Sequence, residues 1–136
     1  MLEICKRQVN LETLNLSENL NVSDKVTEDL SYLFTSSSTI KHLYLDKTAI
    51  TIKGLRKIMI SIKDSLKVRT LSIKSCDLPL NHQEGQEIVE LLKQNISLTS
   101  FSFEKNYLDD DFIQGIKKEL IFNKQIVENI FPQLVL

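Results

Sequence analysis

The sequence predicts an α/β fold in which one strand–helix unit recurs along the chain. A frame with apolar first, fourth and sixth positions begins at Leu11 and returns at Ile40, Val68 and Leu98, in steps of 29, 28 and 30 residues. Each frame alternates apolar and polar residues, as a half-buried strand does. Apolar residues at helical spacing follow each frame. A fixed period of about 20 to 50 residues is typical of a solenoid.

Strands that are joined by helical crossovers must run parallel. We therefore expect a right-handed, curved α/β solenoid with parallel strands on its concave face and α-helices on its convex face, built from four full repeats and partial repeats at both ends. Residues 1–10 are predicted to form a partial N-terminal helix or cap. Residues 125–136 are predicted to form a degraded C-terminal repeat or cap with an edge strand, because Pro132 cannot donate to a sheet.

The helices have recognisable beginnings. The first is predicted from Ser23 and Asp24 to about Phe34, and the second begins after a Thr51 cap. Asn81 and Glu84 have the spacing of a capping box. Three aspartates, 109–111, open the last helix, where negative charge favours the helix dipole.

The ninth position of the frame is small and mostly polar. We expect its four residues to stack in a column and to bond backbone groups where the chain leaves each strand. The column consists of Asn19, Thr48, Cys76 and Asn106.

The stretch from Leu91 to Asp110 carries a family resemblance. Its helix end, its Asn95-Ile-Ser-Leu link, its strand and its Asn106-Tyr-Leu turn resemble the leucine-rich repeat family, of the ribonuclease-inhibitor type with 28–29-residue repeats. The resemblance covers residues 4 to about 124 and departs from the pattern at Phe101 and Phe103. It implies a single leucine-rich-repeat domain over residues 1–136. It also implies protein recognition on the concave face, without catalysis.

Composition excludes several classes of function. The chain has 136 residues and a net charge of −1, so no overall field selects a nucleic acid or a membrane. We read no signal peptide, and no apolar run is long enough to span a bilayer. Two cysteines without disulfide spacing favour a reducing compartment. These features predict a cytoplasmic or otherwise intracellular monomer, and they leave open its delivery into a host cell.

The outward strand positions are the predicted partner-binding surface. Tyr44 is the preferred anchor, since tyrosine is enriched at interface hot spots, and His42 stands beside it. An adaptor, regulator or inhibitor would dock there on another protein. The predicted binding residues are His42, Tyr44, Asp46, Asn15, Ser17, Ser72, Lys74, Ser102 and Glu104.

Two alternatives remain open. Residues 41–74 hold nine Lys or Arg and two Asp, a net of +7, so an anionic ligand or a nucleic acid is a second hypothesis. Its basic patch consists of Lys53, Arg56, Lys57 and Lys63. Without aromatic residues interleaved, nucleic acid is the weaker form of this idea. The third hypothesis is a structural segment of a longer solenoid.

Enzymatic functions are poorly supported. His42 and His82 are predicted on a strand and at a helix start, and Cys76 is predicted in the buried column, so a catalytic Cys–His pair is not expected. The glycines stand singly and form no phosphate-binding loop. Consecutive aspartates at 109–111 lack the spacing of a calcium loop. We therefore expect no catalytic activity, no cofactor and no metal site.

Overall fold

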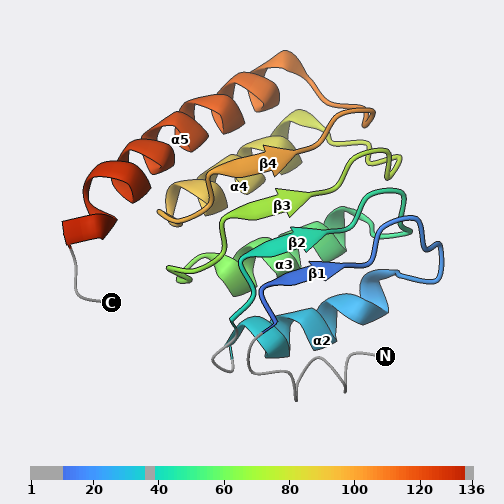
Figure 1. The fold of residues 1–136 in the computed structure, drawn as a ribbon. Coiled ribbons are helices and arrows are strands. Elements are labelled where there is room, and N and C mark those ends of the chain that lie inside the picture. Colours follow the sequence, from blue (N-terminus) through green and yellow to red (C-terminus); the bar gives the residue numbers. More distant parts are fainter. Residues whose placement is uncertain (1–10, 36–38, 134–136) are drawn as a thin grey trace.

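A four-stranded parallel sheet and four helices make up the described part of the chain (Figure 1). The structure is a computed structural model and describes residues 11–35 and 39–133. The strands are β1 (Thr13–Asn15), β2 (His42–Tyr44), β3 (Thr70–Ser72) and β4 (Ser100–Ser102). The helices are α2 (Asp24–Thr35), α3 (Ile52–Ile62), α4 (His82–Lys93) and α5 (Asp110–Asn129). A 3-10 turn, η1 (Phe131–Gln133), follows α5.

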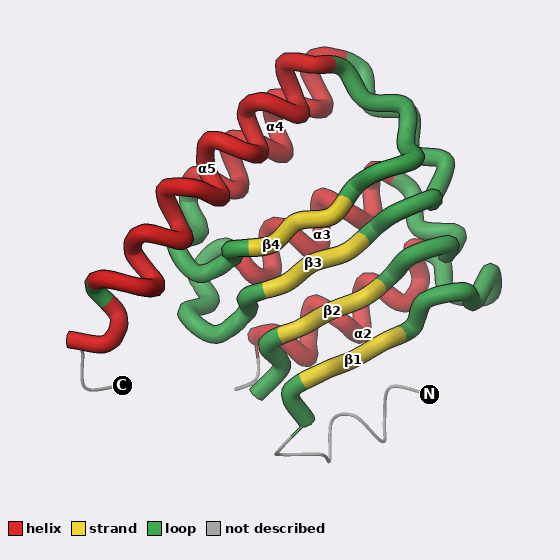
Figure 2. The backbone as a smooth tube through the Cα atoms, turned by 45° about the horizontal axis from the view of Figure 1, so that its top comes forward, coloured by secondary structure: helices red, strands yellow, loops and turns green. Residues whose placement is uncertain are grey.

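The sheet order β1-β2-β3-β4 is the order of the chain. Leu14, Leu43, Leu71 and Phe101 are register partners across the four strands. The helices lie on one side of the sheet, each beside the next, and together they form a two-layer domain (Figure 2). The predicted inward positions pack between these layers, where Leu43, Leu45 and Leu71 are almost fully buried. The inward register predicted from the frame is therefore confirmed.

Of the predicted caps, the capping box at Asn81 is confirmed, and the side-chain cap at Thr51 is not formed. Asn81 and Glu84 form the predicted capping box, and the Asp109 carboxylate accepts the Phe112 N–H at 2.7 Å. Thr51 does not cap α3 with its own side chain. Instead, the carboxylate of Asp24 accepts both the Thr51 N–H, at 2.8 Å, and the Thr51 hydroxyl. This contact ties the start of α2 to the start of α3.

The ninth-position column is formed by three of its four predicted members. Asn106 Oδ1 accepts the N–H groups of Cys76 and Leu78 at 3.0 and 3.1 Å. Thr48 Oγ1 donates to the Leu45 carbonyl at 2.8 Å. Within the described residues, the side chain of Asn19, in the first unit, accepts the N–H of Asn21 and no other. The column thus bonds backbone groups where the chain leaves the inner strands. At the first strand, it only closes a local turn.

The predicted solenoid with partial repeats at both ends is wrong. The chain forms a small α/β domain with four parallel strands and four helices. The predicted edge strand near Val127 is absent, because α5 continues through that position to Asn129. Asn123, buried in α5, donates to the Leu98 carbonyl at 2.9 Å and so holds the helix against the chain that leads into β4. The N-terminal cap predicted for 1–10 lies outside the described residues.

The C-terminal turn packs against the segment that leads into β3. Phe131 is buried, and the guanidinium of Arg69 lies 5.3 Å from the centre of its ring. Burial lowers the pKa of Arg69 from its ordinary value. Phe131 and Pro132, which were expected in an edge strand or cap, therefore lie in a 3-10 turn.

Candidate functional site

A shallow cleft of about 480 Å³ lies where the chain leaves the strands. We call it the strand-end cleft. Six of the residues predicted for partner binding line it, and they come from all four strand–helix units. They are Asn15, Ser17, Tyr44, Asp46, Lys74 and Glu104. The register of the sheet brings them together, because residues 28 to 30 positions apart are neighbours on adjacent strands.

Three predicted binding residues do not line the cleft. The His42 ring bonds Thr70 Oγ1 at 2.9 Å, one strand away. Ser72 is only 2% exposed, and Ser102 is half-buried. The prediction treated all outward positions as equally accessible. In the structure, Ser72 is buried and its hydroxyl donates a hydrogen bond to Asp46. We therefore restrict the candidate site to the residues that line the cleft.

Asp46 links three neighbouring units. Its Oδ1 accepts the Ser72 hydroxyl at 2.6 Å and the Lys74 N–H at 2.7 Å. Its own N–H donates to Ser17 Oγ at 3.0 Å. Hydrogen bonds from these two neutral donors fix the position of the carboxylate and leave its negative charge in place. Asp46 therefore shapes the cleft and contributes one negative charge to it.

Four further cleft residues were missed from the sequence: Glu18, Lys47, Ser75 and Lys105. Each occupies the eighth position of its frame and has a positive φ, between 54° and 63°. For residues other than glycine, this left-handed conformation costs of order 1 kcal/mol. The signal in the sequence was positional, since a polar residue precedes every member of the ninth-position column. The residue types at the eighth position, which include two lysines and a glutamate, do not predict a left-handed turn.

Two of the four residues of the basic patch, which lies on α3 and at its C-cap, pair with carboxylates of the neighbouring helices. Arg56 pairs with Glu87 of α4 at 3.3 Å, and Lys57 pairs with Glu28 of α2. The helical layer thus alternates an acidic, a basic and an acidic helix. Of the patch, only Lys53 and Lys63 lack a carboxylate within 4.0 Å in the described ranges. These pairs account for half of the basic patch without an external anion.

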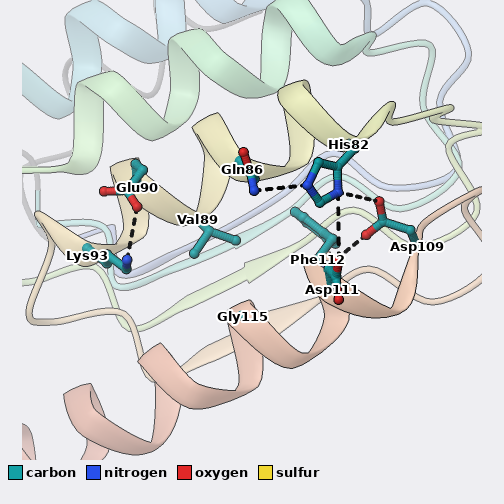
Figure 3. Close-up of a pocket in the computed structure, with 9 residues that line it drawn as sticks. All are labelled: His82, Gln86, Val89, Glu90, Lys93, Asp109, Asp111, Phe112 and Gly115. Atoms are coloured by element: carbon teal, nitrogen blue, oxygen red, sulfur yellow. Dashed lines mark hydrogen bonds and ion pairs between the residues drawn. The ribbon is translucent and has the colours of Figure 1, made fainter.

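A second hollow, of about 440 Å³, lies between α4 and α5 (Figure 3). Its floor contains Val89, Phe112 and Gly115. The amide of Gln86 donates to His82 Nε2 at 2.9 Å, so His82 Nδ1 carries the proton and faces Asp109 Oδ2 at 3.4 Å.

The polar side chains that line this hollow form hydrogen bonds and ion pairs with one another. Asp111 is the second carboxylate near His82, at 3.8 Å from Nδ1. At the other end, Glu90 accepts a hydrogen bond from Lys93 at 2.9 Å and raises the pKa of that lysine (Figure 3). The hollow therefore offers few free groups to a ligand.

Neither hollow has the composition of a metal centre. Across residues 11–35 and 39–133, no three His, Cys, Asp or Glu side chains are grouped so that they would hold a metal ion. Over the same ranges, no helix has both the length and the apolar character that crossing a bilayer requires.

Comparisons with known proteins place the fold. No family model matches the sequence, and no curated protein matches it. Among solved structures, actin-binding site 2 of leiomodin-1 superposes with a TM-score of 0.79 and 20% identity, covering 96% of this chain and 75% of that one. The tropomodulin C-terminal domain of Caenorhabditis elegans gives a TM-score of 0.73 and 14% identity, over 93% of this chain and 95% of that one.

This chain has the fold of those two domains. The finding overturns the predicted membership in the leucine-rich repeat family of the ribonuclease-inhibitor type. The chain is similar instead to small α/β domains of leiomodin and tropomodulin. The local frame was read correctly, but its extension into a multi-repeat solenoid was not, because α5 ends the array after four strands.

Proposed function

We propose that this chain is a non-catalytic protein-binding domain whose partner is actin. The observation that carries the proposal is the similarity to actin-binding site 2 of leiomodin-1, which extends over 96% of this chain. The strand-end cleft supports it, because its lining of mixed charges around one tyrosine suits a protein surface better than a small molecule. An actin partner also places the domain inside the cell.

We infer that Tyr44 anchors the partner in the strand-end cleft. Its side chain is half-buried and belongs to β2, one of the two central strands. A tyrosine held by a sheet loses little conformational freedom on binding, which is one reason why such residues become hot spots. The flanking lysines and carboxylates would form the polar rim of the interface.

The first test is binding of the full 136-residue chain to purified actin. We expect saturable binding to monomeric actin by fluorescence anisotropy, to filamentous actin by co-sedimentation, or to both. Absence of binding to either form at about 100 μM, where even weak complexes with a Kd near that value would be half-formed, would exclude actin as the partner.

Tyr44→Ala tests whether the cleft is the binding surface. We expect the Kd for actin to rise about tenfold, because the substitution removes the proposed anchor and leaves the β2 backbone in place. His42→Ala is the matched control, since His42 lies on the same strand and does not line the cleft. Equal losses of affinity in the two variants would contradict an interface that is centred on the cleft. Far-UV circular dichroism would confirm that both variants remain folded.

A further inference from the structure

The strained residues of the strand-end cleft stand in one row. Register places Glu18, Lys47, Ser75 and Lys105 at the same position of four adjacent units, and all four have a positive φ. The three glycines of the chain are elsewhere, and none of them has a positive φ. Glycine would adopt this conformation without cost. Each of these four residues therefore makes the folded state less stable than glycine would at the same position.

Strain of this kind concentrates at binding sites, where the surrounding structure holds it in place. Here the backbone around the row is held by hydrogen bonds between units. The N–H of Lys47 donates to the Lys74 carbonyl at 2.9 Å, and the N–H of Ser75 donates to the Glu104 carbonyl at 3.0 Å. These bonds fix the direction in which the strained residues present their side chains to the cleft.

The charged side chains that line the cleft differ in whether they have an ion-pair partner. Three carboxylates and three ammonium groups give a formal charge of zero. The Asp46 carboxylate accepts hydrogen bonds from the Ser72 hydroxyl and the Lys74 N–H, which hold it in place without removing its charge. Glu18, at one end of the row, lies 3.7 Å from Lys47 in an exposed pair, which holds either charge only weakly.

Lys74 and Lys105 have no carboxylate within 4.0 Å in the part of the chain that the structure describes, and Glu104 has no cation within that distance. Lys47, Lys74 and Lys105 belong to three consecutive units whose strands are about 4.8 Å apart. An extended acidic segment laid across the strands would meet one ammonium group at each step.

We propose that Lys47, Lys74 and Lys105 bind an acidic segment of the partner protein, and that the strained backbone at Lys47 and Lys105 is retained to hold their ammonium groups at the cleft. The proposal rests on the proposed function only in that the partner is a protein docked in this cleft. It adds the chemistry of the segment that is recognised and the residues that recognise it.

Glycine substitutions separate this role from a structural one. In Lys47→Gly and in Lys105→Gly, we expect Tm to rise by roughly 2–4 °C as the strain is relieved. The Kd for actin should rise about three- to fivefold in each variant as an ammonium group is lost. Asp77→Gly is the matched control, since Asp77 has a similar positive φ of 53° and does not line the cleft. Its Tm should rise in the same way, and its affinity for actin should not change. Glycine variants that gain stability and keep full affinity would overturn the proposal.

A second probe makes the test independent of actin. A synthetic glutamate-rich peptide should bind the wild-type domain more tightly than its glutamine counterpart, and this difference should shrink in Lys47→Gly, in Lys105→Gly and at high salt. Equal binding of the two peptides would overturn the inference even if actin binds. Preference for the acidic peptide without actin binding would keep the inference and reject actin as the partner. Tighter binding of a single-stranded oligonucleotide than of the acidic peptide would also overturn it.

Discussion

Asn95→Ala is expected to lower the free energy of unfolding by about 3 kcal/mol. Asn95 is 1% exposed and joins the ends of two helix-to-strand connections. Its Nδ2 donates to the carbonyls of Ile62 and Ser65, at 2.7 and 3.2 Å. Its Oδ1 accepts the N–H groups of Ser97 and Leu98, at 3.0 and 2.7 Å. Alanine would leave these buried backbone groups without partners, and each such group costs about 1–3 kcal/mol when water does not reach it.

Asn19→Ala is the matched control for this substitution. Asn19 is the same residue type, but within the described residues its side chain accepts only the N–H of Asn21, in an exposed turn. We expect its loss to cost less than about 1 kcal/mol. Urea denaturation followed by circular dichroism measures both variants. Similar losses in the two would show that the bonds from Asn95 to the preceding connection contribute nothing beyond a local turn.

Gly54→Ala is expected to destabilise the fold by about 2 kcal/mol, against the usual preference of helices for alanine. Gly54 is buried in α3, where a Cβ atom would overlap the Asp24 carboxylate and lie 2.9 Å from Ile50 Cγ2. That carboxylate is the one that accepts the N–H and hydroxyl of Thr51. The substitution would therefore push α2 away from α3 and break the contact between their first turns.

Gly115→Ala provides the comparison, because it receives the same gain of about 1 kcal/mol in helix propensity. Its Cβ would meet only the side chain of Val89, 3.0 Å from Cγ2, and Gly115 borders the hollow between α4 and α5. We expect a change within about 1 kcal/mol of zero. Thermal unfolding of the two variants checks the difference. A Gly54→Ala protein as stable as the wild type would contradict the close packing of α2 against α3.

The parts of the fold that follow from local patterns were predictable. Alternation placed Leu43 and Leu45 in the core, because the side chains of a strand point to opposite faces in turn. The capping box at Asn81 depends on two side chains three residues apart, so four letters of sequence suffice to find it.

The end of the array was not predictable in the same way. Val127 lies where a further frame was expected to begin, and the apolar residues around it fit a strand or a helix equally well. The choice is made by contacts that are distant in the chain. One is the bond from Asn123 to the Leu98 carbonyl, and another is the packing of Phe131 near Arg69. Neither contact leaves a local signature in the sequence.

The candidate site was half predictable. Strand alternation identified Tyr44 and Lys74, but it could not show that Ser72 is buried or that Asp46 is held by its own chain. The left-handed row was missed because lysine and glutamate rarely take that conformation. Their backbone geometry is imposed by the turns between units, and the residue types themselves disfavour it.

The chain-ordered sheet has a consequence for how the protein folds. Every pair of strands joins residues only 28 to 30 positions apart, so no sheet contact requires the closure of a long loop. Sheets with such local pairing fold faster than sheets of similar size whose strands pair across the whole sequence. Opening should then begin at an end of the array and not at its centre. Amide hydrogens that bridge β2 and β3 should be the last of the sheet to exchange with deuterium.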